Sequence, residues 1–76
     1  MSLSTNAEKF DKIYLTQREL EVLRHLILGK SNSEIAKELI ITPHTVKAHI
    51  KSIFEKLSVH DRVQAAVKAI REGLVE

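Results

Sequence analysis

The strongest constraint on the fold is the short distance between two predicted helices near the middle of the sequence. One run of apolar residues at helical spacing ends at Leu39, and only Ile40 and Ile41 separate it from the next helix start. That start is marked by Thr42, a good helix cap, and by Pro43, whose missing N–H costs nothing in a first turn. A link this short forces a sharp turn, so the sequence predicts a helix-turn-helix.

Three further helix starts are marked by a polar residue with a glutamate or glutamine three positions later. Each side chain in such a pair satisfies the free backbone N–H of the other residue. These pairs predict helices that begin after Thr16, Ser31 and Asp61. Gly29 and Gly73 tolerate a left-handed backbone and are expected to end the first and last helices.

The apolar residues recur at the period of a helix and show almost no alternation at the period of a strand. We therefore expect an all-α domain of four helices, with the helix-turn-helix formed by the second and third. The residues expected to face the core are Leu20, Leu23, Leu26 and Ile27 in the first helix, Ile35, Ala36 and Leu39 in the second, and Val46, Ile50, Ile53 and Leu57 in the third.

The size and composition of the chain exclude several classes of protein. Its 76 residues suffice for one small domain, and the absence of cysteine excludes disulfides and thiolate metal sites. Its apolar runs are too short to span a membrane, and its polar first residues do not form a secretory signal. We expect a cytoplasmic protein in which residues 1–14 are a flexible tail or linker and residues 15–76 form the folded domain.

The basic charge is concentrated in the third predicted helix. The net charge is only +2, but this helix with its cap carries three lysines, two histidines and a single acid. Its outward side would present Lys47 and Lys51, which can reach guanine or phosphate oxygens, and Ala48, which can contact a thymine methyl group. Thr42 and Thr45 lie near the helix N-terminus, where hydroxyls and free N–H groups suit phosphates. The alternative is an ordinary solvated face.

The predicted fourth helix, about residues 62–72, is apolar on more than one side. A helix that covers one side of a core needs an apolar stripe only about 100° wide. The additional apolar surface indicates a second buried contact, with a partner. The sequence leaves open which apolar side faces the core. The alternative is that its alanines are simply good helix formers on a surface. The apolar residues are Val63, Ala65, Ala66, Val67, Ala69 and Ile70.

The first predicted helix carries several charged residues near its start. We expect these charges to cap the helix and to form ion pairs on its surface. The alternative is that this helix contacts RNA polymerase. The residues are Arg18, Glu19, Glu21 and Arg24.

We expect no catalytic, metal or cofactor site. His44 and His49 are five residues apart, about 140° around a helix, and so do not converge on one ligand. His25 and His60 are remote in the sequence, and no carboxylate or nucleophile accompanies a histidine at a recognisable spacing.

Four spaced blocks of the sequence resemble, in order, the LuxR-type (NarL/FixJ/GerE-type) helix-turn-helix domain of bacterial transcription regulators. Together they cover residues 15 to about 74. The blocks are LTQRELEVL (15–23), GKSNSEIA (29–36), ITPHTVKAHIKSIFEKL (41–57) and DRVQAAVKA (61–69). The resemblance implies sequence-specific binding to double-stranded DNA, with the third helix as the recognition helix. It also implies a homodimer formed through the last helix, which would read inverted-repeat promoter sites.

The resemblance assigns roles to particular residues of this sequence. It implies that Lys47, Ala48 and Lys51 face the edges of the bases. It places Thr45, His49 and Ser52 near the sugar-phosphate backbone, together with Ser31 and Asn32 from the preceding helix. With Thr42 from the argument above, these are the expected DNA contacts. The residues expected in the dimer contact are Val63, Ala66, Val67 and Ile70.

The resemblance further implies an N-terminal receiver or ligand-binding sensor domain outside this chain. We favour a two-component response regulator, because the polar N-terminal residues resemble a linker rather than a sensor. A small free-standing regulator of the same family is the nearest alternative. Two others are a helical protein-interaction module, whose basic face only confers solubility, and a promoter-reading domain of a sigma factor.

Overall fold

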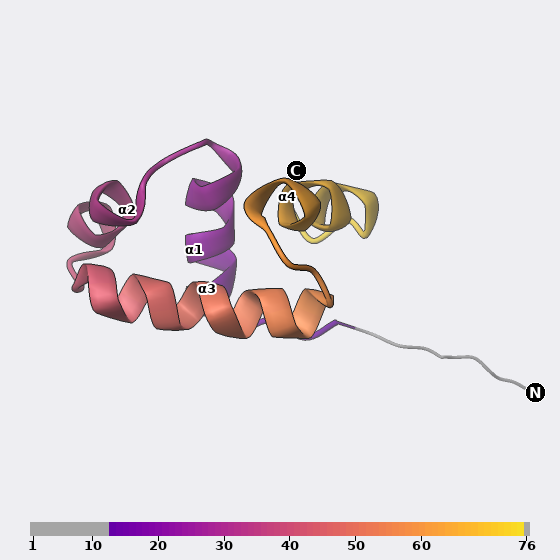
Figure 1. The fold of residues 1–76 in the computed structure, drawn as a ribbon, viewed down its shortest axis with the longest axis horizontal. Coiled ribbons are helices and arrows are strands. Elements are labelled where there is room, and N and C mark those ends of the chain that lie inside the picture. Colours follow the sequence, from indigo (N-terminus) through magenta and orange to yellow (C-terminus); the bar gives the residue numbers. More distant parts are fainter. Residues whose placement is uncertain (1–12, 76) are drawn as a thin grey trace, which may run out of the picture.

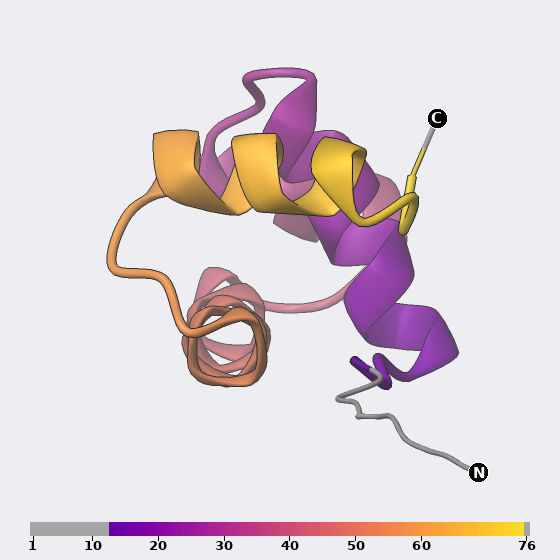
Figure 2. The same ribbon diagram turned by 90° about the vertical axis from the view of Figure 1, so that its right-hand side faces the viewer.

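The computed structural model describes residues 13–75, which form four α-helices and contain no strand. The helices are α1 (Gln17–Ile27), α2 (Asn32–Leu39), α3 (Pro43–Leu57) and α4 (Arg62–Arg71). The longest, α3, runs along one side of the molecule, and α2 and α4 lie over its opposite ends (Figure 1). Figure 2 views α3 end-on and shows α4 crossing it steeply. The predicted all-α fold is confirmed.

The predicted tail lies mostly outside the described residues, which begin at Ile13. Ile13 itself is partly buried against the core, whereas Tyr14 is exposed. None of the helices in residues 13–75 is both long and apolar enough to cross a bilayer.

The first two helices begin with the reciprocal caps that the sequence predicts. The Thr16 hydroxyl accepts from the backbone N–H of Glu19 at 3.0 Å, and the Glu19 carboxylate accepts from the N–H of Thr16 at 2.9 Å. Ser31 and Glu34 repeat the arrangement in α2: the Ser31 hydroxyl accepts from the N–H of Glu34 at 3.2 Å, and the Glu34 carboxylate accepts from the N–H of Ser31 at 2.7 Å. Both predictions are confirmed, because a cap depends only on residues three apart in the sequence.

The caps of α3 and α4 are also at the predicted residues. Thr42 accepts from the N–H of Thr45 at 3.1 Å, and proline is the first residue of α3. Asp61 accepts from the N–H of Gln64 at 2.8 Å. The Gln64 side chain, however, accepts from the N–H of His60 rather than from Asp61. The reciprocal half of this pair is therefore displaced by one residue.

The turn between α2 and α3 consists of Ile40 and Ile41, as predicted. The N–H of Ile41 donates to the carbonyl of Ala36 at 3.0 Å, which closes the end of α2. Ile40 adopts the left-handed conformation, with φ 57° and ψ 49°, and its side chain is 89% exposed. Left-handed backbone costs an L-residue about 1–2 kcal/mol, and a β-branched residue is unusual there. The turn therefore holds a strained residue that the sequence did not indicate.

The core lies where α1, α3 and α4 meet, with α2 packed against α1 and α3. Most of the residues predicted to face inward are buried, but α1 differs from the prediction. Leu20 is half-exposed, while Val22, which was not expected inside, is fully buried. The buried positions of α1 are 19, 22, 23 and 26, so Glu19 takes the place predicted for Leu20. The buried apolar residues are Val22, Leu23, Leu26, Ile35, Ala36, Val46, Ile53, Leu57, Ala65 and Ala69.

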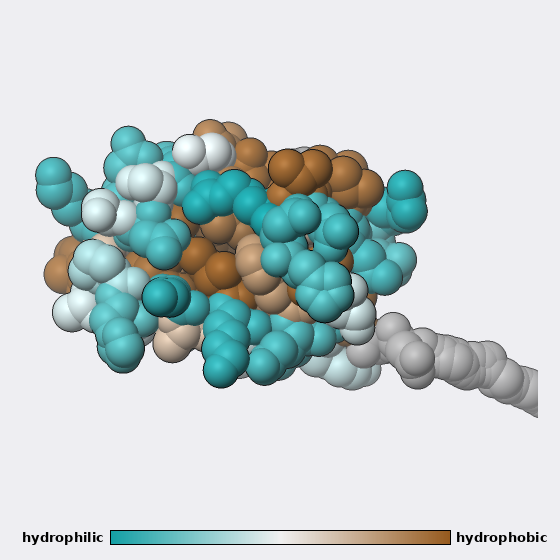
Figure 3. All heavy atoms as spheres, viewed as in Figure 1, coloured by the Kyte–Doolittle hydropathy of each residue, from teal (hydrophilic) through white to brown (hydrophobic). Residues whose placement is uncertain are grey.

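The structure decides which side of α4 faces the core. Ala65 and Ala69 are fully buried, whereas Val63, Val67 and Ile70 are 72%, 47% and 58% exposed. Apolar residues accordingly gather on the surface over α4 (Figure 3). The helix thus turns its smallest side chains inward and its larger aliphatic side chains outward.

Candidate nucleic-acid interface

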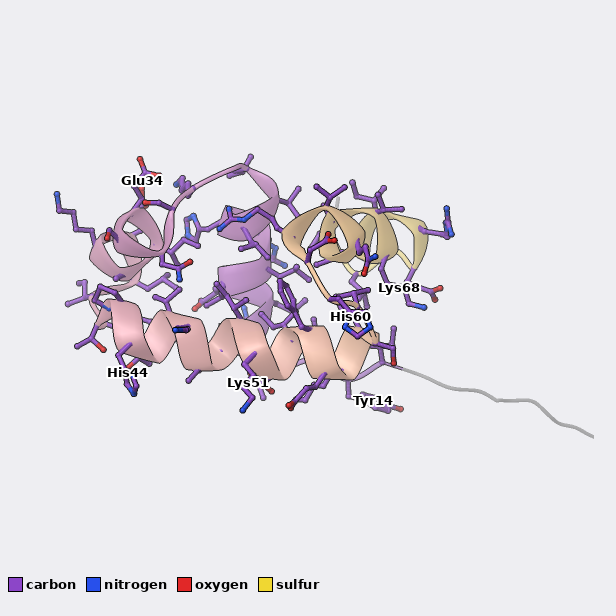
Figure 4. The ribbon with its side chains drawn as sticks, viewed as in Figure 1. Tyr14, Glu34, His44, Lys51, His60 and Lys68 are labelled. Carbon is purple, nitrogen blue, oxygen red and sulfur yellow. The ribbon has the colours of Figure 1, made fainter. Side chains whose placement is uncertain are left out.

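The outer face of α3 presents basic and small side chains. Lys47, Ala48 and Lys51 are exposed, while Val46 and Ile53 are fully buried on the opposite side of the helix. In Figure 4 the side chain of Lys51 and that of His44, one turn of helix before Lys47, both point away from the rest of the molecule. The three residues predicted to contact bases therefore share one accessible surface.

A groove of about 930 Å³ runs along this face and continues to the loop between α3 and α4. Its polar walls include Lys47 and Lys51, and its apolar lining includes Ile50, Phe54 and Val59. Ile50, which was predicted to face the core, packs partly against it and also lines this groove, but the apolar strip as a whole was not predicted. The spacing of residues 47, 50, 51 and 54 would have indicated it, because residues three, four and seven apart share one side of a helix. The remaining lining residues are His44, Ala48, Glu55, Ser58 and His60.

The electrostatics of α3 favour an anion at its outer face. The first turn of the helix contains no acid, so no side chain of that turn neutralises the positive end of the helix dipole. Glu55 is the single acid that lines the groove. Of the three lysines in α3, only Lys56 turns elsewhere, to the carboxylate of Glu19 at 2.8 Å. The other two lysines are thus available to a ligand on this face.

The predicted backbone contacts from α3 form a separate group. Thr45, His49 and Ser52 do not line the groove, and each is half-buried. The hydroxyls of Thr42 and Thr45 lie 2.9 Å apart at the start of the helix. The helical period places positions 45, 49 and 52 on one flank of α3, beside the outer face.

Ser52 lies at the contact between α3 and α1. Its hydroxyl donates to the carboxylate of Glu19 at 2.7 Å. A phosphate oxygen needs a hydrogen-bond donor, and a serine has only one O–H to give. The structure therefore directs Ser52 to the interior of the domain rather than to a ligand.

Ser31 and Asn32 lie at the start of α2 and do not line the groove. The Ser31 hydroxyl accepts from the N–H of Glu34 and keeps its own O–H to donate, and the Glu34 side chain points to the side of the molecule opposite Lys51 (Figure 4). These two predicted contacts therefore belong to a different part of the surface from the outer face of α3.

Glu19 is buried, although it was predicted to lie on the surface. Its capping role is confirmed, but it is only 5% exposed instead of lying on the surface. Burial raises the pKa of Glu19, but hydrogen bonds from Lys56, Thr16 and Ser52 outweigh that effect and lower the pKa from 4.5 to about 2. The carboxylate therefore stays ionised and holds α3 against α1. By contrast, Arg18 and Glu21 form an exposed pair at 3.4 Å, as expected.

The histidines do not gather around a common ligand. The Nδ1 atom of His25 accepts from the ammonium of Lys30 at 3.1 Å, and Lys30 also pairs with Glu38 at 3.0 Å. Within residues 13–75, no three histidine or acidic side chains are placed to hold a metal ion.

A short helix, a two-residue turn and a longer helix with an exposed basic face define a helix-turn-helix domain of the DNA-binding type. Residues 14–69 match the family described as bacterial regulatory proteins, luxR family. The chain belongs to this family of DNA-binding transcription regulators. The predicted resemblance is confirmed.

Curated relatives include the transcriptional regulatory protein LiaR of Bacillus subtilis, which is 57% identical over 61 residues. That match covers 80% of this chain and 29% of LiaR. The response regulator protein VraR of Staphylococcus aureus is 45% identical over 62 residues, covering 82% of this chain and 30% of VraR. The chain thus spans less than a third of the length of these two relatives.

A solved structure, that of the response regulator ChrA in a heme-sensing two-component system, has a similar fold. The TM-score is 0.80 and the sequence identity is 36%. The match covers 87% of this chain and 33% of ChrA.

Proposed function

We propose that this domain binds double-stranded DNA by placing α3 in the major groove, and that it regulates transcription from the sites it recognises. The observation that carries the proposal is the exposure of Lys47, Ala48 and Lys51 on one face of a helix whose opposite face is buried. The lysines would donate to guanine O6 and N7, and the alanine would let the helix approach a thymine methyl group.

Contacts to phosphates would supply much of the affinity and would orient the domain on the duplex. We assign these contacts to Thr42, Thr45 and His49 of the α3 region, and to Ser31 and Asn32 at the start of α2. Ser52 is left out of the set, because its hydroxyl is donated to Glu19.

We propose that two copies of the domain associate through α4. The exposed aliphatic side chains Val63, Val67 and Ile70 support this, together with the half-buried Ala66 beside them. A two-fold symmetric dimer would place two α3 helices in successive major grooves and would therefore read an inverted repeat.

For the whole protein, we propose a cytoplasmic response regulator of a two-component system, in which a receiver domain controls this DNA-binding domain. The support is the name of VraR, a response regulator protein, and the fact that the match covers only 30% of it. RNA polymerase is a further proposed partner, for which the exposed charged side of α1 is available.

The test is binding to a fluorescently labelled duplex over a series of salt concentrations. We expect affinity to fall steeply as the salt concentration rises. Each counterion that the protein releases from the DNA phosphates makes the plot of log affinity against log salt concentration steeper. The Lys47→Ala/Lys51→Ala double variant should bind at least about tenfold more weakly, since a base contact is worth roughly 1–3 kcal/mol. The Arg18→Ala/Arg24→Ala double variant removes the same two charges from the exposed side of α1 and is the charge-matched control, which should bind like the parent protein.

Two results would count against the proposal. One is equal binding by the double variant and the parent, which would remove α3 from the interface. The other is an absence of binding at low salt even when the domain is fused to a dimerising segment.

A further inference from the structure

Arg62 connects the start of α4 to the end of α1 and to the turn that follows α1. It is the first residue of α4, and its guanidinium donates to the carbonyl of Lys30 at 2.7 Å and to that of Leu26 at 3.4 Å. Leu26 lies in the last turn of α1, and Lys30 lies in the turn that leads into α2. Within residues 13–75, no other side chain of α4 hydrogen-bonds to α1, to α2 or to the turn between them.

The chemistry of this contact makes it both strong and directional. The shorter bond goes to the carbonyl of Lys30 in the turn after α1, and the longer one reaches Leu26 at the negative end of the α1 dipole, where the carbonyl also accepts from the N–H of Gly29. A guanidinium brings a permanent charge to that end, and its donors have a fixed planar arrangement. The contact therefore restrains the direction of α4 as well as its distance from α1.

The apolar contact of α4 with the core restrains direction far less. It is made by the methyl groups of Ala65 and Ala69, both fully buried. Small side chains allow close approach but form only low ridges, and ridges in grooves are what fix the angle between helices. At the other end of α4, Leu74 packs partly against the core. Within residues 13–75, Arg62 thus supplies the side-chain hydrogen bonds that tie the first turn of α4 directly to the end of α1 and the turn after it.

We propose that Arg62 is a positioning residue that sets the spacing between the two half-sites that the dimer reads. The inference rests on the proposed dimer through α4. In such a dimer, the angle of α4 on each domain determines the separation and relative rotation of the two copies of α3. One base pair adds about 3.4 Å and roughly 35° of rotation to DNA. A dimer in which α4 is held at a fixed angle therefore binds half-sites at one spacing. A dimer in which the angle of α4 varies binds half-sites at several spacings.

The experiment begins with a library of random duplexes, from which the parent protein selects its sites. The selected site is then remade with one base pair added to or removed from the spacer, and binding is measured by fluorescence anisotropy. For the parent we expect each change to weaken binding about tenfold, comparable to a mismatched base pair. For Arg62→Lys we expect the same spacer changes to weaken binding by about threefold or less. Lysine keeps the charge but lacks the planar arrangement of N–H donors that restrains the direction of α4.

Two further measurements separate this effect from general damage. At the preferred spacing Arg62→Lys should bind within about threefold of the parent, since Arg62 does not line the groove of α3. Arg24→Lys, the same change at an exposed arginine of α1, should keep the full spacing penalty. Circular dichroism checks the fold, and Arg62→Gln, which retains two N–H donors, replaces Arg62→Lys if helical signal is lost.

An unchanged spacing penalty in the folded variant would overturn the role of Arg62 and leave the proposed function intact. A parent protein that binds DNA but selects only single half-sites would overturn the dimer and this inference together. A parent protein that selects no DNA at all would overturn the proposed function itself.

Discussion

Lys56 of α3 and Glu19 of α1 are joined by an ion pair of 2.8 Å, although they lie 37 residues apart in the sequence. The same carboxylate caps α1 through Thr16 and accepts the hydroxyl of Ser52. The buried carboxylate of Glu19 therefore caps α1 and also holds α3, the helix that carries the candidate DNA-binding face, against it. Removing its charge should loosen two elements at once.

We predict that Glu19→Gln lowers the free energy of unfolding by about 1–3 kcal/mol, because it removes a buried charge and leaves Lys56 without its partner. For a domain of this size, that corresponds to a fall in melting temperature of at least about 4 °C. Glu34→Gln is the matched control, since Glu34 makes the same cap in α2 but is exposed. Urea denaturation followed by circular dichroism measures both. Equal losses of unfolding free energy in the two variants would show that the contact of Glu19 with α3 does not stabilise the domain.

The lowered pKa of Glu19 predicts an acid-sensitive part of the stability. The folded-state pKa of about 2 lies below the ordinary value of 4.5, so the stabilisation is complete above pH 4.5 and is lost as pH falls toward 2. It amounts to at most about 3 kcal/mol. The difference in unfolding free energy between the parent and Glu19→Gln should therefore shrink steadily over this interval. A difference that stays constant from pH 6 to pH 2, by the same denaturation measurement, would contradict the assignment.

The helix boundaries could be predicted from the sequence because each cap involves neighbours in the chain, as Thr16 and Glu19 illustrate. The burial of Glu19 could not, since its partner Lys56 is distant and either residue alone looks like a surface charge. The orientation of α4 was also open, because both of its sides are apolar. Only the fit against the other helices selects Ala65 and Ala69 for the interior.

The left-handed Ile40 predicts a stabilising substitution. Asparagine tolerates this conformation better than a β-branched residue does. Because the side chain is 89% exposed, no packing is lost. We expect Ile40→Asn to raise the free energy of unfolding by about 0.5–1 kcal/mol. Ile41→Asn, at the partly buried neighbour, should instead destabilise the domain. A lower free energy of unfolding in Ile40→Asn, measured by urea denaturation, would show that the Ile40 side chain makes a stabilising contact.

The exposed side of α4 predicts a variant that separates folding from association. Val67→Glu should change the unfolding free energy of the monomer by no more than about 0.5 kcal/mol, as for most surface changes. It should also weaken self-association, because two carboxylates would face each other across the two-fold axis. Leu28→Glu, at an exposed leucine outside α4, is the control. Analytical ultracentrifugation measures the association. Identical behaviour of the two variants would place the dimer contact elsewhere.

The division of α4 into an inner alanine side and an outer aliphatic side has an evolutionary consequence. Ala65 and Ala69 are held by the interior, which has no room for larger side chains without rearrangement. Val63, Val67 and Ile70 are under no such restriction. After gene duplication, two copies could diverge at these outer positions and keep the same fold. If such copies associate through α4 as proposed, regulators that coexist in one cell would become insulated from one another through three side chains, without any change to α3.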